Sequence, residues 1–425
     1  MEIHELYKYY CENYKIETDT RKDLNNCIYF ALKGVNFNGN IFAEQALKSG
    51  ASYAVVDEEK YKTDDRILLV DDVLKTLQDL ALYHREQMGI PIISLTGSNG
   101  KTTTKELVSV VLNQKFNCVS TKGNLNNHIG VPLTLLSMKP DTEIGVVEMG
   151  ANHPGEIEFL CNIAKPDYGY ITNFGKVHLE GFGDLEGVIE AKTELYRYLK
   201  AHHKKVFINM SDPVQVERSE GMDRITFGGE DADFRTSFLK ADPFVSVKAG
   251  QVEIHSKLIG KYNYLNIATA VTIGEYFDIP LKKIKRAIER YVPENNRSQI
   301  IKKESNKIIS DAYNANPNSM TVALENLDQL ADTSKTAILG DMFEIGKDAL
   351  KEHQVIADLA GRLDIDKVLL IGETFSQVKI QNKKIKLFKD FAGLKDYLKD
   401  HHLKNSTILI KASRGMKMER VIDLL

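Results

Sequence analysis

The sequence predicts an α/β protein of three domains: a small N-terminal α/β domain, a central domain with a mostly parallel sheet, and a C-terminal Rossmann-like domain. Three observations lead to this fold class. At 425 residues the chain is too long for one ordinary core. Short apolar runs alternate with helical stretches along most of it. Breaks at Gly89 and Pro293 divide the alternation into three series.

The first domain is expected to span residues 1–88. Its strand candidates are short apolar runs, at residues 27–32, 54–56 and 67–70. Helical stretches are predicted over residues 42–49 and 73–87. The sequence Gly89-Ile90-Pro91 then ends this series, because glycine and proline interrupt helices.

The central domain is expected over residues 89–294. Its strand candidates alternate with helical stretches and lie at residues 92–95, 144–147, 168–172 and 206–208. Such alternation predicts a mostly parallel sheet with helices on both faces and ligands at the carboxyl ends of its strands. Residues 226–256 are richer in alternating and turn residues, which predicts an antiparallel flap.

The C-terminal domain is expected over residues 295–425. It follows a helical stretch at residues 281–291 and a break at residues 293–296. Each of its strand candidates is followed by a turn and a helical stretch, at residues 308–310, 336–339, 367–371 and 407–410. This order predicts a second, Rossmann-like sheet.

The composition excludes several classes of protein. The net charge is −3, from 56 basic and 59 acidic residues, so no global field attracts nucleic acid or an anionic membrane. No apolar segment approaches the ~18 to 20 residues that span a bilayer, and the N-terminus lacks the apolar core of a signal peptide. Four cysteines without CxxC spacing indicate neither a zinc site nor a disulfide framework. We expect a cytoplasmic protein with no nucleic-acid partner and no membrane insertion.

The strongest functional motif is TGSNGKTTTKE at residues 96–106, directly after the apolar run of residues 91–95. Its glycines allow a tight turn whose N–H groups face phosphate oxygens at the start of a helix. Lys101 would reach the β- and γ-phosphates, and the Thr102 hydroxyl would face Mg²⁺. A merely Gly- and Thr-rich turn does not require this lysine. The motif predicts a P-loop ATPase-like domain that binds ATP through Gly97, Ser98, Asn99, Gly100, Lys101, Thr102 and Thr103.

This loop is shorter than the generic P-loop, because Leu95 stands where that motif has its first glycine. The form TGSNGKTT resembles the Mur ligase family, and the resemblance extends nearly end to end. The strings SDAYNANP at residues 310–317 and LGDMFEIG at residues 339–346, with His353 downstream, resemble the branch that adds D-Ala-D-Ala. The resemblance implies an ATP-dependent ligase that joins D-Ala-D-Ala to UDP-MurNAc-tripeptide through an acyl phosphate, in cytoplasmic peptidoglycan precursor synthesis.

The resemblance also implies a magnesium site formed by Thr102, Glu148, His178 and Lys192. Glu148 begins an EMGA segment after an apolar run, and His178 lies in a TN-x₄-HL segment. The family has a CO₂-carbamylated lysine at the position of Lys192, and a carbamate oxygen suits Mg²⁺ where an ammonium would be repelled. Lys101, His178 and Lys192 are therefore the implied catalytic residues. Taken alone, Glu148 would be a solvated strand-end carboxylate and Lys192 an ordinary helix lysine.

Other nucleotide contacts follow from the resemblance alone. Asn266 matches the second asparagine of a G-x-HN-x₂-N segment that contacts nucleotide, although Tyr262 replaces the usual histidine. Arg297 matches an arginine that reaches the γ-phosphate, a task that suits a planar and always charged group. Asp311 and Asn314 are implied to face the nucleotide from the third domain.

Three groups of residues are implied to bind the other substrates. Thr20, Arg21, Asn38 and Gly39 resemble segments that hold the uridine diphosphate end, with Asn40 in place of a histidine. Asn124, Asn126 and Asn127 resemble the segment near the muramoyl peptide. Lys411, Ser413 and Arg414 resemble a substrate-binding K-G-S-R segment, with Ala412 for glycine. Lys411 and Arg414 would steer carboxylates unless they form only a surface charge cluster.

Two alternatives stay open at this point. A related ligase that adds glutamate or a diamino acid would share the loop, His178 and Lys192 but not the YNANP string. A P-loop nucleotide switch would carry out no ligation. We expect a monomer. We also expect its domains to close on the substrates, because Lys101 and Arg297 lie on either side of the break at Pro293. The sequence does not choose lysine or diaminopimelate as the third residue of the tripeptide, and it singles out no general base.

Overall fold

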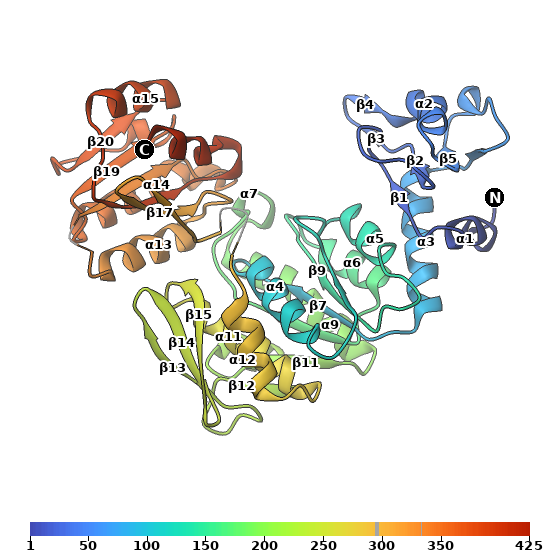
Figure 1. Ribbon diagram of the computed structural model, residues 1–425, viewed down its shortest axis with the longest axis horizontal. Helices are drawn as coiled ribbons and strands as arrows, with labels where there is room; N and C mark the ends of the chain where they lie inside the picture. Colours follow the sequence, from blue (N-terminus) through green and yellow to red (C-terminus); the bar gives the residue numbers. More distant parts are fainter. Residues whose placement is uncertain (294–296, 333) are drawn as a thin grey trace.

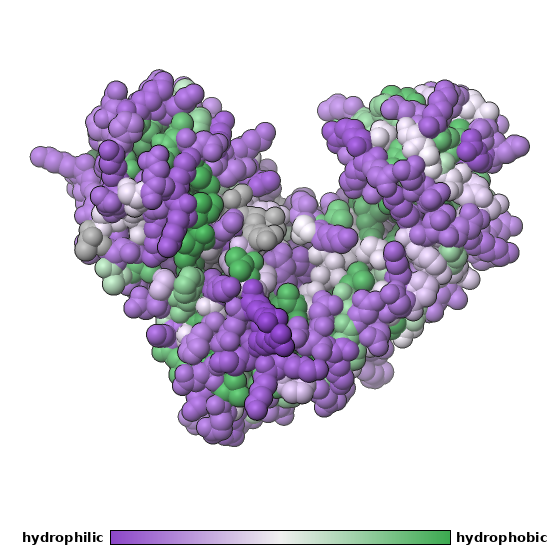
Figure 2. All heavy atoms as spheres, viewed as in Figure 1, coloured by the Kyte–Doolittle hydropathy of each residue, from purple (hydrophilic) through white to green (hydrophobic). Residues whose placement is uncertain are grey.

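The computed structural model describes residues 1–293, 297–332 and 334–425. The molecule is shaped like an open V, with the N-terminal and C-terminal lobes as its arms and the central domain at its base (Figure 1). The space-filling view shows the hollow between the two arms, above the central domain (Figure 2). In the described part of the chain, no helix combines the length and the apolar character needed to cross a membrane.

The N-terminal lobe contains a four-stranded parallel sheet in the order β1-β2-β5-β6. Its predicted strands and helices are confirmed, with ends that shift by one or two residues. The elements are α1 (Ile3–Cys11), β1 (Ile16–Glu17), β2 (Ile28–Phe30), the hairpin β3 (Lys33–Gly34) and β4 (Phe37–Asn38), α2 (Ala43–Lys48), β5 (Tyr53–Val56), β6 (Ile67–Leu69) and α3 (Val73–Met88).

Helix α3 connects this lobe to the central domain. Asp72 caps its start by accepting a hydrogen bond from Lys75 N, and Gly89 ends it in the left-handed conformation. Its apolar face packs against α5 (Gly130–Leu135) and α6 (Glu156–Ala164), so that one buried core runs through both parts. The expected boundary after residue 88 falls at the end of this shared helix.

The central domain is built on a six-stranded parallel sheet in the order β12-β11-β10-β7-β9-β8. Successive residues of strand β7 face opposite sides of the sheet. Ile92 belongs to the core under α6, and Ile93 belongs to the core under α4 (Lys101–Leu112). The strands are β7 (Ile92–Thr96), β8 (Cys118–Ser120), β9 (Ile144–Glu148), β10 (Tyr168–Ile171), β11 (Lys205–Asn209) and β12 (Asp223–Phe227), and the helices not yet given are α7 (Leu179–Phe182), α8 (Leu185–Lys192), α9 (Glu194–Ala201), α10 (Pro213–Arg218), α11 (Asn263–Tyr276) and α12 (Leu281–Arg290).

The predicted antiparallel flap exists, but it begins later than expected. Residues 226–227 belong to β12 at the edge of the parallel sheet, and the flap proper is β13 (Thr236–Ala241), β14 (Phe244–Ala249) and β15 (Val252–Ile259). The flap packs on α11 and α12, at the lower left of the molecule in Figure 1.

The C-terminal lobe is a second six-stranded sheet, in the order β16-β17-β21-β18-β19-β20. Only β16 runs antiparallel to its neighbour, so the Rossmann-like prediction is confirmed for the other strands. The elements are β16 (Gln299–Lys303), β17 (Asn306–Asp311), α13 (Pro317–Gln329), β18 (Lys335–Gly340), α14 (Ala349–Arg362), β19 (Lys367–Ile371), β20 (Ile385–Phe388), α15 (Phe391–Asp400) and β21 (Thr407–Lys411). The expected boundary between residues 294 and 295 lies outside the described residues.

Candidate active site

The loops that follow β7, β9 and β10 form the floor of one large cavity. These three strands are neighbours in the central sheet and run parallel, so their carboxyl ends meet at one edge. The cavity has a volume of about 930 Å³ and is also lined by residues of the C-terminal lobe. A ligand in it would contact two domains at once.

The phosphate-loop motif adopts the turn that its glycines predict. Gly97 and Gly100 have φ angles of 134° and 79°, a region that favours glycine. A Cβ atom on Gly97 would lie 2.1 Å from Thr172 Oγ1. Lys101 folds back over the loop and donates to the carbonyls of Gly97 (2.6 Å) and Ser98 (3.3 Å). Burial lowers the pKa of Lys101, and the charge of Arg297 lowers it further, whereas Glu148 opposes the shift.

The loop is held in place by the segment that follows β10. The Ser98 hydroxyl donates to Gly175 O and accepts from Gly175 N. Asn99 N donates to Asn173 Oδ1 at 3.0 Å, and Thr172 Oγ1 donates to Asn99 O at 2.6 Å. The loop is therefore preorganised by its neighbour in the sheet rather than by its own sequence alone.

A buried carboxylate lies beside the loop. Glu148 Oε2 accepts from Thr102 Oγ1 at 2.9 Å, and Oε1 accepts from Asn126 Nδ2 at 2.8 Å. Both side-chain partners are neutral, so the charge of Glu148 is not paired by them. Within the described residues no three His, Cys, Asp or Glu side chains form a metal-binding group. A divalent cation here would therefore take hydroxyl, amide and phosphate oxygens besides Glu148, a hard donor set that fits Mg²⁺.

His178 and Lys192, the two other residues implied as metal ligands, have partners other than Glu148. His178 lines the cavity and forms an ion pair with Glu344 of the C-terminal lobe. Burial lowers the pKa of His178, and Glu344 opposes the shift. The Lys192 ammonium lies behind the cavity wall, where it donates to Ala151 O at 3.2 Å and faces the Phe182 ring. Burial, followed by the charge of Lys101, lowers the pKa of Lys192 to about 7.

The other predicted nucleotide residues all line the cavity. Asn266 Oδ1 accepts from Thr104 Oγ1 at 3.0 Å, which places this amide beside the phosphate-loop helix. The Arg297 guanidinium stacks on the Tyr313 ring at 3.6 Å. In the same lobe, Asp311 and Asn314 both bind Lys411, through Asp311 Oδ2 (2.7 Å) and the Asn314 carbonyl (3.0 Å).

The predicted substrate residues separate into two groups. Asn124, Asn126, Asn127 and Lys411 line the cavity. The others do not line it: Thr20, Arg21, Asn38 and Gly39 lie in the N-terminal lobe, and Ser413 and Arg414 lie beyond β21. Lys411 is 3% exposed, so the surface-cluster alternative is wrong for it, whereas the side chain of Arg414 remains 61% exposed.

In the N-terminal lobe, the residues predicted to bind the uridine diphosphate end already form contacts within the protein. Arg21 forms an ion pair with Asp19 at 2.7 Å. Asn38 Oδ1 accepts from Asn40 N, and its amide donates to Glu58. The buried Asn40 side chain hydrogen-bonds Asp57, so the asparagine that replaces the family histidine has a structural partner.

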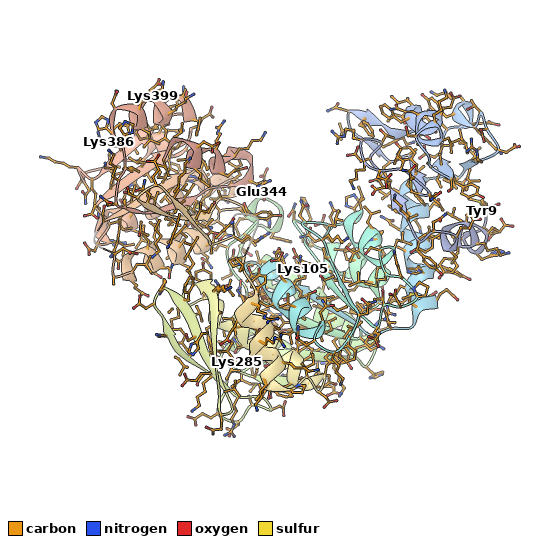
Figure 3. The ribbon with its side chains drawn as sticks, viewed as in Figure 1. Tyr9, Lys105, Lys285, Glu344, Lys386 and Lys399 are labelled. Atoms are coloured by element: carbon orange, nitrogen blue, oxygen red, sulfur yellow. The ribbon has the colours of Figure 1, made fainter. Side chains whose placement is uncertain are left out.

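Three contacts between the central domain and the C-terminal lobe involve residues that the sequence did not single out. Asn316 Nδ2 donates to Asn99 Oδ1 at 2.8 Å. Glu344 pairs with His178, and Glu352 pairs with Lys176 at 3.1 Å. Figure 3 shows Glu344 at the edge of the C-terminal lobe that faces α7. Asn316 and Glu344 lie inside the strings SDAYNANP and LGDMFEIG, which resemble the family. These strings were the only feature of the sequence that could have pointed to the two residues.

Comparison with known proteins agrees with this architecture. A model of the Mur ligase middle domain matches residues 95–274, and a model of the Mur ligase, glutamate ligase domain matches residues 296–414. The chain belongs to the Mur ligase family. UDP-N-acetylmuramoyl-tripeptide--D-alanyl-D-alanine ligase of Bacillus subtilis (strain 168) is 33% identical over 421 residues, which cover 96% of this chain and 92% of that protein. The Escherichia coli (strain K12) protein of the same name is 31% identical, with 96% and 93% covered.

Solved Mur ligase structures share the whole fold. A crystal structure of MurF from Acinetobacter baumannii has a TM-score of 0.86 and 30% identity, and the match covers 96% of this chain and 93% of that one. MurF ligase from Thermotoga maritima in complex with ADP has a TM-score of 0.84 and 27% identity, with 96% of each chain covered. The three-domain α/β prediction is confirmed.

Proposed function

We propose that this Mur ligase joins D-Ala-D-Ala to UDP-MurNAc-tripeptide, with cleavage of ATP, in peptidoglycan precursor synthesis. The observation that carries the proposal is the single cavity in which Lys101 and Glu148 of the central domain meet Arg297 and Asp311 of the C-terminal lobe. The choice of acceptor is supported by the names of the Bacillus subtilis and Escherichia coli relatives, which align over nearly the whole chain.

The phosphates of ATP would be bound from two domains. The N–H groups of the loop and the start of α4 favour anions on one side. Lys101 now donates to two loop carbonyls, and phosphate oxygens would be stronger, charged acceptors for it. Arg297 contributes a planar cation from the other side.

The reaction requires two bond exchanges. The terminal carboxylate of the tripeptide attacks the γ-phosphorus, and the bond from phosphorus to the ADP oxygen breaks. The dipeptide amine then attacks the acyl carbon, loses a proton, and displaces inorganic phosphate as the amide forms. Lys101 and Arg297 would stabilise the charge on the transferred phosphoryl group, where such preorganised charges act most strongly.

Thr102 and Glu148 are the residues best placed to hold Mg²⁺. When bound, the ion would neutralise and orient the phosphate oxygens. Glu148 is 2% exposed and has only neutral side-chain partners, which fits a carboxylate that receives a cation. His178 is a further proposed ligand, and it would have to exchange Glu344 for the metal.

Lys192 is proposed to act as a carbamate. Only a neutral amine adds CO₂, and a pKa of about 7 leaves much of the Lys192 amine neutral near neutral pH. The ammonium first loses one proton, and a second proton leaves as the new N–C bond forms, so that a buried cation becomes an anion. That change would remove the repulsion from Lys101 and supply an oxygen donor toward Mg²⁺.

The proposal is tested by phosphate release with defined acceptors. The protein is incubated with ATP, Mg²⁺ and UDP-MurNAc-tripeptides that end in lysine or diaminopimelate. We expect phosphate release to require both a tripeptide and D-Ala-D-Ala. Equal turnover with D-Glu or a diamino acid would identify another Mur ligase activity, and phosphate release without an acceptor would favour a nucleotide switch.

A further inference from the structure

A hydrogen bond between Tyr262 and Ser298 joins the central domain to the C-terminal lobe. The two hydroxyl oxygens lie 2.7 Å apart. Tyr262 directly precedes α11, and Ser298 directly precedes β16. Both residues line the nucleotide cavity. The bond therefore crosses from one domain to the other within the cavity wall, one residue away from Arg297.

The position of Ser298 is also fixed from within the C-terminal lobe. Its backbone N–H donates to Asp311 Oδ1 at 3.2 Å, and Asp311 Oδ2 binds Lys411. Ser298 has a φ angle of 52°, a left-handed conformation that a non-glycine residue adopts when surrounding contacts hold it there. Losing one of these contacts would let the backbone around Arg297 relax.

The central domain is built to receive the Tyr262 ring. A Cβ atom on Gly260 would lie 2.3 Å from this ring, so the glycine makes room for it. Helix α11 begins at the next residue and carries Asn266, whose amide binds Thr104 on the helix of the phosphate loop. Burial and the charge of Asp311 raise the pKa of Tyr262 above its usual value, so the hydroxyl stays protonated and neutral.

Arg297 and Lys101 both line the cavity. The charge of Arg297 contributes to lowering the pKa of Lys101, which indicates that the two cations are close enough to repel each other. A polyanion between them would remove that repulsion. The distance between the two cations then decides whether both reach the same phosphate.

We propose that Tyr262 is a positioning residue that, through Ser298, fixes Arg297 opposite Lys101 for contact with the terminal phosphate of the nucleotide. The inference rests on the nucleotide part of the proposed function and not on the identity of the acceptor. Tyr262→Phe keeps the ring that fills the space beside Gly260 but removes the hydroxyl. Ser298 would then lose its contact with the central domain, and Arg297 would lose its fixed position.

The test compares binding of ADP with binding of a non-hydrolysable ATP analogue, both with Mg²⁺, by calorimetry. Wild type should prefer the analogue. Because one neutral hydrogen bond contributes on the order of 1 kcal/mol, Tyr262→Phe and Ser298→Ala should each reduce that preference about two- to tenfold. The double variant should show no further reduction, because the two changes remove the same bond.

Tyr264→Phe is the matched control. Tyr264 lies in α11, the helix that Tyr262 directly precedes, and its hydroxyl donates to Thr236 O at 2.8 Å, outside the cavity wall. This variant should keep the wild-type preference for the analogue. Melting temperatures check that each variant is folded, and Ser298→Ala carries the same prediction if Tyr262→Phe does not fold.

Three results would overturn the inference: an unchanged preference in Tyr262→Phe and Ser298→Ala, equal weakening of both nucleotides, or effects that multiply in the double variant. No acceptor is present in this experiment. A failure of D-Ala-D-Ala ligation would therefore refute the proposed acceptor while leaving the nucleotide result intact, and the two failures are distinguishable.

Discussion

The proposed carbamate on Lys192 requires a neutral amine. The surroundings of Lys192 determine what fraction of this amine is neutral. The pKa of Lys192 is lowered from 10.5 to about 7 by burial and by the charge of Lys101. At pH 7 about half of such amines are neutral, whereas about three in 10,000 would be neutral without the shift. Burial thus increases the reactive fraction about a thousandfold. With the pKa lowered to about 7, this neutral fraction is high above pH 7 and falls steadily as the pH drops through 7.

Activity should therefore depend on CO₂, most strongly on the acidic side of pH 7. We expect enzyme depleted of CO₂ to lose most of its phosphate release at pH 6 and to regain it when bicarbonate is added. The readouts are initial rates of phosphate release across pH 6 to 9 and the carbamate carbon signal of ¹³C-labelled enzyme. Lys192→Ala should lose most activity, and formate or acetate should restore part of it by supplying a carboxylate.

Two variants serve as controls. Lys192→Arg keeps the positive charge and fills the space, so small carboxylates should not rescue it. Lys200→Ala removes a helix lysine whose ammonium binds the Glu220 carbonyl at the surface, and it should behave as wild type. Near-normal turnover of Lys192→Ala in bicarbonate-free buffer would refute the reasoning.

Three further outcomes follow from the cavity. Gly97→Ala should abolish nucleotide binding measured by calorimetry, because a Cβ atom would lie 2.1 Å from Thr172 Oγ1 at a φ angle that disfavours alanine; unchanged affinity would contradict this. Glu148→Gln should lower kcat about 100-fold or more with little change in melting temperature, since a neutral amide removes the charge that faces Mg²⁺; retained turnover would exclude a metal role. X-ray scattering should show compaction of the V when nucleotide and tripeptide bind, and an unchanged radius of gyration would contradict closure.

Much of the fold could be predicted because its central strands are buried on both faces. Strands β7 and β9 are continuous apolar runs for that reason, and their ends locate the phosphate loop and Glu148. Strands at the sheet edges gave weaker hydrophobic patterns in the sequence. Strand β16 ends in two lysines and is only partly buried, and every residue of β8 is also only partly buried, so neither strand produced an apolar run in the sequence.

The site could be predicted only where one continuous string carries the chemistry. Gly97, Lys101 and Thr102 are neighbours in sequence and remain neighbours in space. The pairing of His178 with Glu344 depends on how two domains meet, which no local pattern records. The lowered pKa of Lys192 likewise depends on burial by Phe182 and on Lys101, and the sequence around Lys192 reads only as a helix.

The most direct measurement of the central claim follows oxygen from the peptide to phosphate. UDP-MurNAc-tripeptide labelled with ¹⁸O in its terminal carboxylate is incubated with the protein, ATP, Mg²⁺ and D-Ala-D-Ala, and both products are analysed by mass spectrometry. Ligation through an acyl phosphate predicts one pentapeptide product for each phosphate and one ¹⁸O atom in that phosphate. Unlabelled phosphate, or phosphate released without pentapeptide, would contradict the account.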